Sequence, residues 1–203
     1  EQHGERRSDL DRPGATDLLL AGWHIPPFAH EDTPALILLT TIFGGWHGFT
    51  PFAGGDWRPR SNRLYRALVE GKLATEVSIR QDMKLDPSLL TTNVTLARNV
   101  PLDRVERVLD REVERLRKAV PSKAELARAR RQVHAWYRYE HDGVTCQSGR
   151  RSSLEALVGC DAGESLLGKI DRVRAEQVRQ VARKYLVDDH RSLVRYHAQE
   201  VPS

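Results

Sequence analysis

The alternation of hydrophobic and polar residues predicts two neighbouring β-strands in the first half of the chain. Val77 and Ile79 alternate with polar residues, and the same period of two returns in residues 90–96, beyond a turn marked by Asp86-Pro87. Such alternation is typical of strands in a sheet that has one face in the core and one in solvent. We therefore expect the two segments to form an antiparallel pair.

A longer hydrophobic run, residues 17–25, indicates a strand of a different kind. Its apolar residues occupy positions on both faces, which is typical of a buried central strand. Pro26-Pro27 end this strand, because proline has no backbone N–H to donate. Residues 192–198 are expected to form a closing strand, with Leu193 and Val194 among its apolar residues.

Six other segments are expected to be helical, because their hydrophobic residues recur every three or four positions. They are residues 34–43, 61–70, 102–120, 123–141, a short stretch within 152–168, and 173–185. Thr33 and Ser61 can cap the first two helices, and Ser122 with Glu125 forms a capping-box signature. Gly71 is expected to close the second helix in the left-handed conformation.

The order strand, helix, loop, helix, two strands, helices and strand predicts an α+β fold, with two layers in which helices cover a mainly antiparallel sheet. The length of 203 residues, with 39% hydrophobic and 30% charged residues, fits one globular domain. We assign this domain to residues 17–203 and expect the charged residues 1–16 to form a flexible flank. No segment is apolar over the length that a membrane span requires.

The charge balance does not require a nucleic-acid partner. The chain has 32 basic and 28 acidic residues and a net charge of +4, which is a mild excess. The basic run Arg128, Arg130 and Arg131 is expected to be a solvated helix face, and a basic module that binds acidic partners is a weaker alternative. Cys146 and Cys160 are too few for a disulfide framework and leave the redox compartment open.

Residues 44–60 are rich in glycine and proline, which predicts a long loop. The loop carries four aromatic residues, Trp46, Phe49, Phe52 and Trp57. In the simpler interpretation these rings anchor the loop to the core. In the alternative the loop is a mobile flap over a cleft, because long structureless insertions in compact domains are often functional.

The histidines do not form a recognised zinc-binding motif. A helical zinc site needs two histidines one turn apart with a carboxylate nearby, and the sequence contains neither HExxH nor HxxEH. At His134 the place of the glutamate is taken by Tyr137. His134 and His141 lie two turns apart and cannot close on one ion without other ligands. The GxSxG, P-loop and GxGxxG motifs are also absent from the sequence.

Several segments follow one another in a characteristic order from about residue 17 onward. They are GWHIPP, DTPALILLTTIFGG, SNRLYRALVEGKLATEV, the helix beginning at Leu102, PSKAELARAR and RVRAEQVRQVARKYL. Their order and spacing resemble one half of a zinc peptidase of the insulinase (pitrilysin, processing-peptidase-like) family. In that family, active domains carry HxxEH and a distant glutamate, whereas related domains without it complete a chamber around the peptide substrate.

The resemblance implies that this chain is an inactive domain with no catalytic residue, metal ligand or cofactor of its own. Zinc, its ligands and the general base would belong to a companion HxxEH domain, in the same chain or on another subunit. This chain alone is expected to be inactive, to bind peptide and to complete the chamber. The alternative is a structural or assembly subunit without a role in proteolysis. The resemblance also points to a periplasmic or exported parent, which the residues themselves do not show.

The resemblance also suggests where substrate contacts would lie. Many inactive domains of the family hold the substrate with an arginine and a tyrosine, but the matching positions here are Val69 and Thr75, which cannot do so. Arg63 and Arg66 are the candidates for a compensating role. The loop before this segment is longer than the glycine-rich joint usual in the family. Its aromatic residues, expected to form an apolar wall for substrate side chains, are Trp46, Phe49, Phe52 and Trp57.

Overall fold

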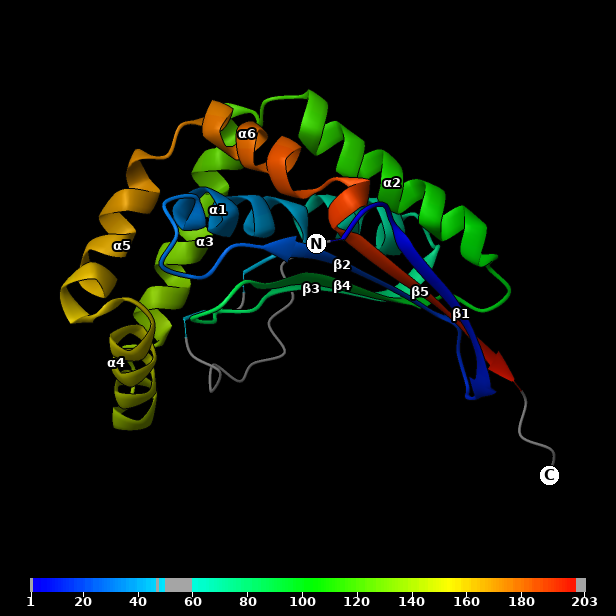
Figure 1. The fold of residues 1–203 in the computed structure, drawn as a ribbon, viewed down its shortest axis with the longest axis horizontal. Coiled ribbons are helices and arrows are strands. Elements are labelled where there is room, and N and C mark those ends of the chain that lie inside the picture. The colour runs from blue at the N-terminus through cyan, green and yellow to red at the C-terminus, as the bar shows by residue number, and fades with distance from the viewer. Residues whose placement is uncertain (1, 47, 50–59, 200–203) are drawn as a thin grey trace.

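One sheet of five strands forms the base of the molecule (Figure 1). The computed structural model describes residues 2–46, 48–49 and 60–199. In this part of the chain the strands lie in the order β1-β5-β2-β4-β3, and only β1 and β5 are parallel neighbours. The strands are β1 (Arg6–Pro13), β2 (Leu18–Ile25), β3 (Ala74–Gln81), β4 (Ser88–Leu96) and β5 (Arg191–Gln199).

Helices cover one face of the sheet and leave the other face open in the described part of the chain (Figure 1). They are α1 (Thr33–Phe43), η1 (Tyr65–Glu70), α2 (Leu102–Lys118), α3 (Lys123–Tyr139), α4 (Val144–Val158), α5 (Cys160–Arg172), α6 (Ala175–Tyr185) and the short η2 (Asp188–His190). The expected α+β fold, with helices over a mainly antiparallel sheet, is confirmed. None of the described helices is both long and apolar enough to cross a membrane.

Helix α1 is buried on every side, although the sequence pattern predicted only one hydrophobic stripe. All of its residues are buried, including Thr33, Thr40 and Thr41. It contacts β3 and is also contacted by α3, α5 and α6, so that both of its faces are covered. The N-cap position is Asp32 rather than the expected Thr33. The sequence pattern did not predict the full burial of α1, because the helices that cover it come from distant parts of the chain.

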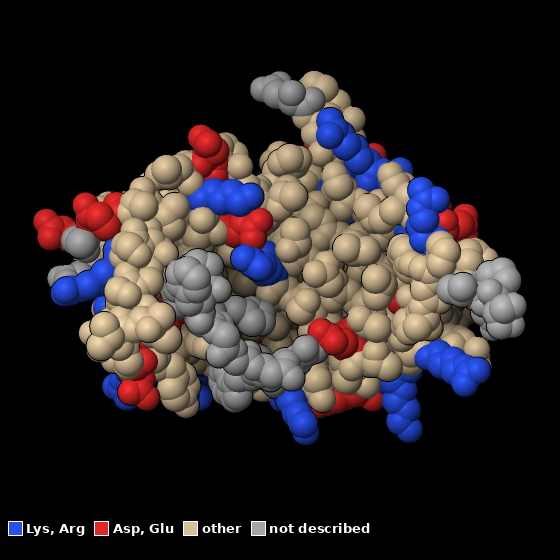
Figure 2. Space-filling model, turned by 90° about the horizontal axis from the view of Figure 1, so that it is seen from below, with Lys and Arg blue, Asp and Glu red and all other residues tan. Residues whose placement is uncertain are grey.

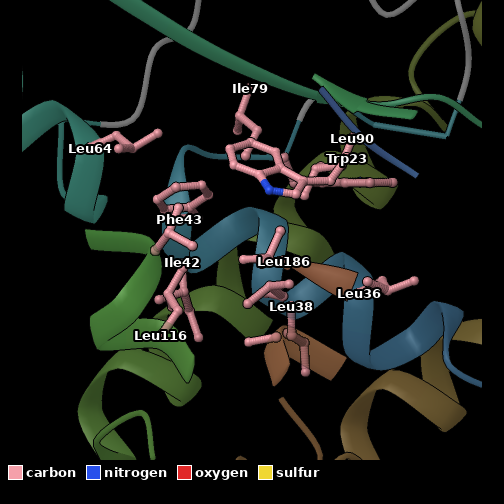
Figure 3. Packing of buried hydrophobic residues seen from close by; sticks show 14 of the residues in the cluster. Trp23, Leu36, Leu38, Ile42, Phe43, Leu64, Ile79, Leu90, Leu116 and Leu186 are labelled. Carbon is pink, nitrogen blue, oxygen red and sulfur yellow. The ribbon is translucent and has the colours of Figure 1, made fainter. Parts of the chain in front are cut away.

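The hydrophobic core lies between the sheet and α1 (Figure 3). Trp23 of β2, Ile79 of β3 and Leu90 of β4 are each 1% exposed, and they lie on the same side of α1 as Phe43 (Figure 3). Leu38 lies on the other side of α1, near Leu186 (Figure 3). Phe43 and Leu38 are both fully buried. Full burial of one such side chain stabilises the fold by about 1.5–3 kcal/mol. The sheet and α1 therefore form one packed unit.

Strand β2 is central, as expected, but it is not buried on both faces. Leu19, Ala21 and Trp23 are buried against the helices, whereas the residues between them are only half-buried and His24 is exposed. The prediction of a doubly buried strand is therefore wrong. The second face of β2 belongs to the open side of the sheet, which carries apolar residues without a helix to cover them in the described part of the chain.

Residues 6–13 form the edge strand β1, within the segment where a flexible flank was expected. The sequence pattern missed this strand because all eight of its residues are exposed and no hydrophobic period marks it. Main-chain pairing with β5 and ion pairs hold it in place. Arg7 Nη2 lies 2.5 Å from Glu106 Oε1 of α2, and Glu5 Oε1 lies 2.9 Å from Arg191 Nε of β5.

The second expected helix is a short π-helix, η1. The side-chain contact at its start comes from Asn62 rather than Ser61, because the Asn62 side-chain oxygen accepts the Tyr65 backbone N–H at 2.7 Å. Gly71 has a φ of −70°, and the left-handed residue is Lys72, with a φ of 56°. Glycine still fits position 71 best, since a Cβ there would lie 2.4 Å from the carbonyl oxygen of Ala67.

Two helices, α4 and α5, occupy residues 144–172, where only a short helical stretch within 152–168 was expected. Gly159 separates them with a φ of 80°, a conformation that favours glycine. The buried residues of α4 are only Gly149, Arg150 and Leu154. This helix therefore carries little of the hydrophobic period on which the prediction depended.

Replacing Gly44 by alanine tests how closely α1 is fitted to the sheet. A Cβ at Gly44 would lie 2.2 Å from Ile79 Cγ2, so Gly44→Ala is expected to lower the free energy of unfolding by about 1–3 kcal/mol. The matched control is Gly168→Ala in α5, where no heavy atom lies within 4 Å of the added Cβ. The control is expected to be neutral or stabilising by up to about 1 kcal/mol. Equal urea midpoints for the two variants would contradict the close fit.

Candidate functional site

A cleft of about 640 Å³ lies beside β3, the strand at one edge of the sheet. In the described part of the chain β3 pairs only with β4, so its other edge has no strand partner. An unpartnered edge presents backbone N–H and C=O groups that an extended chain can bind. The lining consists of residues 78–84 and Asn93 from the β3–β4 pair, Thr40 of α1, Trp46 and Gly48 of the following loop, and Ser153, Ala156 and Leu157 of α4.

Trp46 is the sequence-predicted residue that the structure brings to this cleft. Helix α1 ends at Gly44, and Gly45, with a φ of 107°, turns the chain so that Trp46 follows at once. The side chain is 3% exposed, and its indole N–H has no hydrogen-bond partner in the described part of the chain. A buried donor without a partner costs about 1–3 kcal/mol. A ligand oxygen that accepted this N–H would recover that cost.

Two polar residues that sequence reasoning missed also line the cleft. Thr40 Oγ1 donates to Gln81 Oε1 at 3.2 Å, and both side chains are buried. No sequence signal distinguishes them, because Thr40 lies within a hydrophobic helix and Gln81 at the end of an ordinary strand. Their hydrogen bond links α1 to the edge strand and supplies polar groups next to the apolar Ile79 and Leu157.

This lining combines a strand edge with apolar side chains. The wall formed by β3 can pair with the backbone of an extended peptide, and the apolar residues can receive its alternate side chains. Among the described residues, no group of three or more His, Cys, Asp or Glu is placed to hold a metal ion. The cleft adjoins the open face of the sheet, most of which is neutral, with charged side chains mainly toward its margins (Figure 2).

Phe49 anchors the aromatic loop to the helical layer. It is 1% exposed, its ring lies 5.3 Å from the ring of Trp46, and it lies 6.1 Å from the ring of Tyr137 in α3. Its backbone N–H donates to Glu140 Oε1 at 2.5 Å. At Phe49 these contacts support the interpretation that the aromatic rings anchor the loop to the core, rather than that the loop is a mobile flap. Phe52 and Trp57 lie outside the described residues.

Arg63 and Arg66 do not line the cleft. Arg63 forms a two-point ion pair with Glu125 of α3, with Nε at 2.9 Å from Oε1 and Nη2 at 3.3 Å from Oε2. Arg66 is exposed and faces a groove shared with α2. Thr75 Oγ1 donates to the Thr95 carbonyl oxygen at 3.3 Å, within the sheet. Of the residues predicted to bind substrate, Trp46 therefore lines the cleft beside β3, whereas Arg63 and Arg66 line the groove next to α2.

Glu125 has two tasks at the start of α3. It accepts from the Ser122 backbone N–H, which completes the capping box predicted from the sequence, and it accepts both nitrogens of Arg63. Burial raises the pKa of Glu125, but the hydrogen bonds from Arg63 and Ser122 outweigh this effect and leave the pKa below its ordinary value. The carboxylate form is therefore favoured in the folded protein.

Solved structures share this fold across almost the whole chain. A protease from Helicobacter pylori aligns with 97% of this chain at a TM-score of 0.84 and 18% identity, and this chain spans 45% of that chain. The inactive peptidase domain of a candidate zinc protease from Bordetella parapertussis aligns at a TM-score of 0.77 and 25% identity, over 96% of this chain and 97% of that one. A chain of complex III2 from Candida albicans aligns at 0.74 and 16% identity, over 96% and 46%.

A family model agrees with these structural similarities. The model described as the peptidase M16 inactive domain matches residues 1–133, from β1 into α3. No curated protein matches the chain. The chain spans less than half of the Helicobacter pylori protease chain.

Substituting Arg63 tests whether its ion pair with Glu125 is structural. Because both side chains are partly exposed, Arg63→Gln is expected to lower the free energy of unfolding by about 1 kcal/mol at neutral pH. A lowered folded pKa stabilises the protein above the ordinary glutamate value of about 4.3, and this contribution is lost as the pH falls through the folded value. The difference between wild type and variant should therefore shrink below about pH 4. Urea unfolding of both proteins between neutral and acidic pH measures the difference in free energy of unfolding. A difference that does not change with pH would contradict a stabilising Arg63–Glu125 ion pair.

Proposed function

Because the chain belongs to the peptidase M16 inactive-domain family, we propose that it is the non-catalytic domain of a zinc-dependent metalloendopeptidase. It completes the substrate chamber and binds extended peptide, and a companion domain with an HxxEH motif hydrolyses that peptide. Zinc would be held in the companion, where a metal-bound water can serve as nucleophile. The contribution of this chain is to bind and orient the substrate.

The cleft beside β3 is the observation that carries this proposal. An unpartnered edge strand recognises an extended peptide through main-chain hydrogen bonds, which depend little on the peptide sequence. The indole N–H of Trp46, which has no partner among the described residues, and the apolar Leu157 offer one polar and one apolar contact.

The open face of the sheet supports a role as a chamber wall. Leu18 and Leu20 of β2 and Val194 of β5 lie on this side and are partly buried, and Leu89 of β4 lies there and is exposed. A partly apolar surface of this kind gains free energy when another surface or a ligand covers it. A companion domain facing it would enclose a space with a neutral wall (Figure 2).

The companion would lie in the same polypeptide or on a separate subunit. The Helicobacter pylori protease supports the first arrangement, since this chain spans 45% of that chain and leaves room for further domains. The Bordetella parapertussis structure, of which this chain spans 97%, comprises an inactive domain alone. Both arrangements place the hydrolytic residues outside this chain.

A structural or assembly subunit of the same fold is the alternative function. The similarity to a chain of complex III2 from Candida albicans favours it. So do Val69 and Thr75, which occupy the places of the substrate-holding arginine and tyrosine: Val69 packs against the core, and the Thr75 hydroxyl donates to the Thr95 carbonyl oxygen. Under this alternative the cleft beside β3 would have no effect on peptide turnover.

Arginines introduced into the cleft test the proposed function in the assembled enzyme. Ser78→Arg with Asn93→Arg places two long side chains in the lining and is expected to raise KM for an extended peptide at least ~10-fold, about 1.4 kcal/mol of binding. Zinc content should stay at the wild-type value, because the metal would be held elsewhere. Fluorogenic-peptide kinetics and metal analysis give the two readouts.

The matched control is Ser8→Arg with Leu10→Arg on the opposite edge strand β1, where both side chains are exposed. It should leave KM unchanged. Unchanged kinetics in the cleft variant as well would favour the assembly alternative. If this chain alone bound stoichiometric zinc or cleaved peptide, the proposal that a companion domain holds the zinc and hydrolyses the peptide would be overturned.

A further inference from the structure

A second groove, which we call the arginine groove, lies on the helical side of the molecule. Its volume is about 530 Å³, and it runs between the helical turn before Gly71 and α2. It shares no lining residue with the cleft beside β3. Its lining residues are Arg63, Arg66, Ala67, Arg111, Glu112, Arg115 and Ala119.

The carboxylates beside this groove are already occupied. Glu112 is only 3% exposed, and its Oε1 lies 2.7 Å from Arg115 Nη1. Both oxygens of Glu125 accept from Arg63, and one of them also accepts the Ser122 backbone N–H. Neither carboxylate can therefore turn toward the other guanidinium groups without breaking contacts that it now makes.

Arg66 and Arg111 supply the surplus positive charge. Arg66 is exposed and has no ion pair in the described part of the chain. Arg111 Nε is 4.0 Å from Glu112 Oε1, an oxygen that Arg115 holds more closely, and the Arg111 side chain is 59% exposed. Two guanidinium groups thus face solvent across one groove, and each can bind a carboxylate with two parallel hydrogen bonds.

The shape of the groove also indicates a binding surface. Ala67 and Ala119 are its small residues, which leave room for a chain between the arginines. Ala67 and Arg66 lie in the π-helix η1, a rare backbone form that occurs frequently at functional sites. Arg63 and Arg115 are held in position by their own carboxylates, so part of the groove is preorganised before a ligand arrives.

We propose that the arginine groove docks an acidic segment of a partner polypeptide, whose Asp or Glu side chains pair with Arg66 and Arg111. Charge complementarity favours this occupant, because the groove carries more guanidinium groups than free carboxylates. Among the described residues, the lining contains no aromatic side chain for bases to stack on, which disfavours single-stranded nucleic acid. The docking site is separate from the proposed peptide cleft, and either can fail without the other.

A fluorescent oligoglutamate peptide tests the proposal on the whole chain by anisotropy, with oligoglutamine as the neutral comparison. Oligoglutamate should bind at about 0.05 M salt and weaken markedly at about 0.3 M, because exposed charges are screened. Arg66→Glu with Arg111→Glu should weaken binding at least ~10-fold. Arg66→Gln with Arg111→Gln, which only removes charge, should show a smaller loss, and circular dichroism checks that both variants fold.

The matched control is Arg131→Glu with Arg183→Glu. It makes the same change in net charge at two exposed helical residues outside the groove, and it should retain binding within about two-fold of wild type. Equal losses in the groove and control variants would overturn the proposal, since binding would then follow net charge alone. Tighter binding of a single-stranded oligonucleotide, lost in the same groove variants, would also overturn it in favour of a nucleic-acid site.

Discussion

The burial of α1 on every side is the constraint on which the rest of the structure depends. A helix with no solvent face can be placed only if its sides and ends fit their neighbours closely, because protein interiors are packed without voids. Gly44 lets the C-terminal end of α1 meet Ile79 of β3, and Asn62 Nδ2 donates to the Gly44 carbonyl oxygen at 2.9 Å. This junction brings Trp46 to the edge of the sheet. The cleft therefore follows from the packing of the core.

Ion pairs hold the opposite edge of the sheet in position, as hydrophobic packing holds α1. Strand β1 has no buried face, yet ion pairs join it and its neighbour β5 to α2. Glu106 is 7% exposed and contacts Arg7 of β1 at 2.5 Å and Arg195 of β5 at 2.9 Å. Such pairs gain little net stability, because desolvation offsets most of their attraction. Their effect is to fix the position of the strand.

The two proposed binding surfaces depend on different physical properties of one fold. The cleft depends on an unpaired strand edge and a buried donor, so it suits an extended backbone of varied sequence. The arginine groove depends on unneutralised charge at the surface, so its affinity must vary with ionic strength. Under the two proposals, one domain would bind a substrate and a partner segment at separate places.

Local physics alone determined much of this protein from its sequence. The β3–β4 pair, the helix from Leu102 and the capping box of Ser122 with Glu125 depend on neighbours along the chain, so their patterns predicted them. Contacts between distant segments decided the rest. Strand β1, the full burial of α1, the hydrogen bond from Thr40 to Gln81 and the pairing of Arg63 with Glu125 required the fold to bring remote residues together. The sequence singled out Trp46 for the cleft and Arg66 for the arginine groove, but not the residues that complete either lining, because each is lined by segments that meet only in three dimensions.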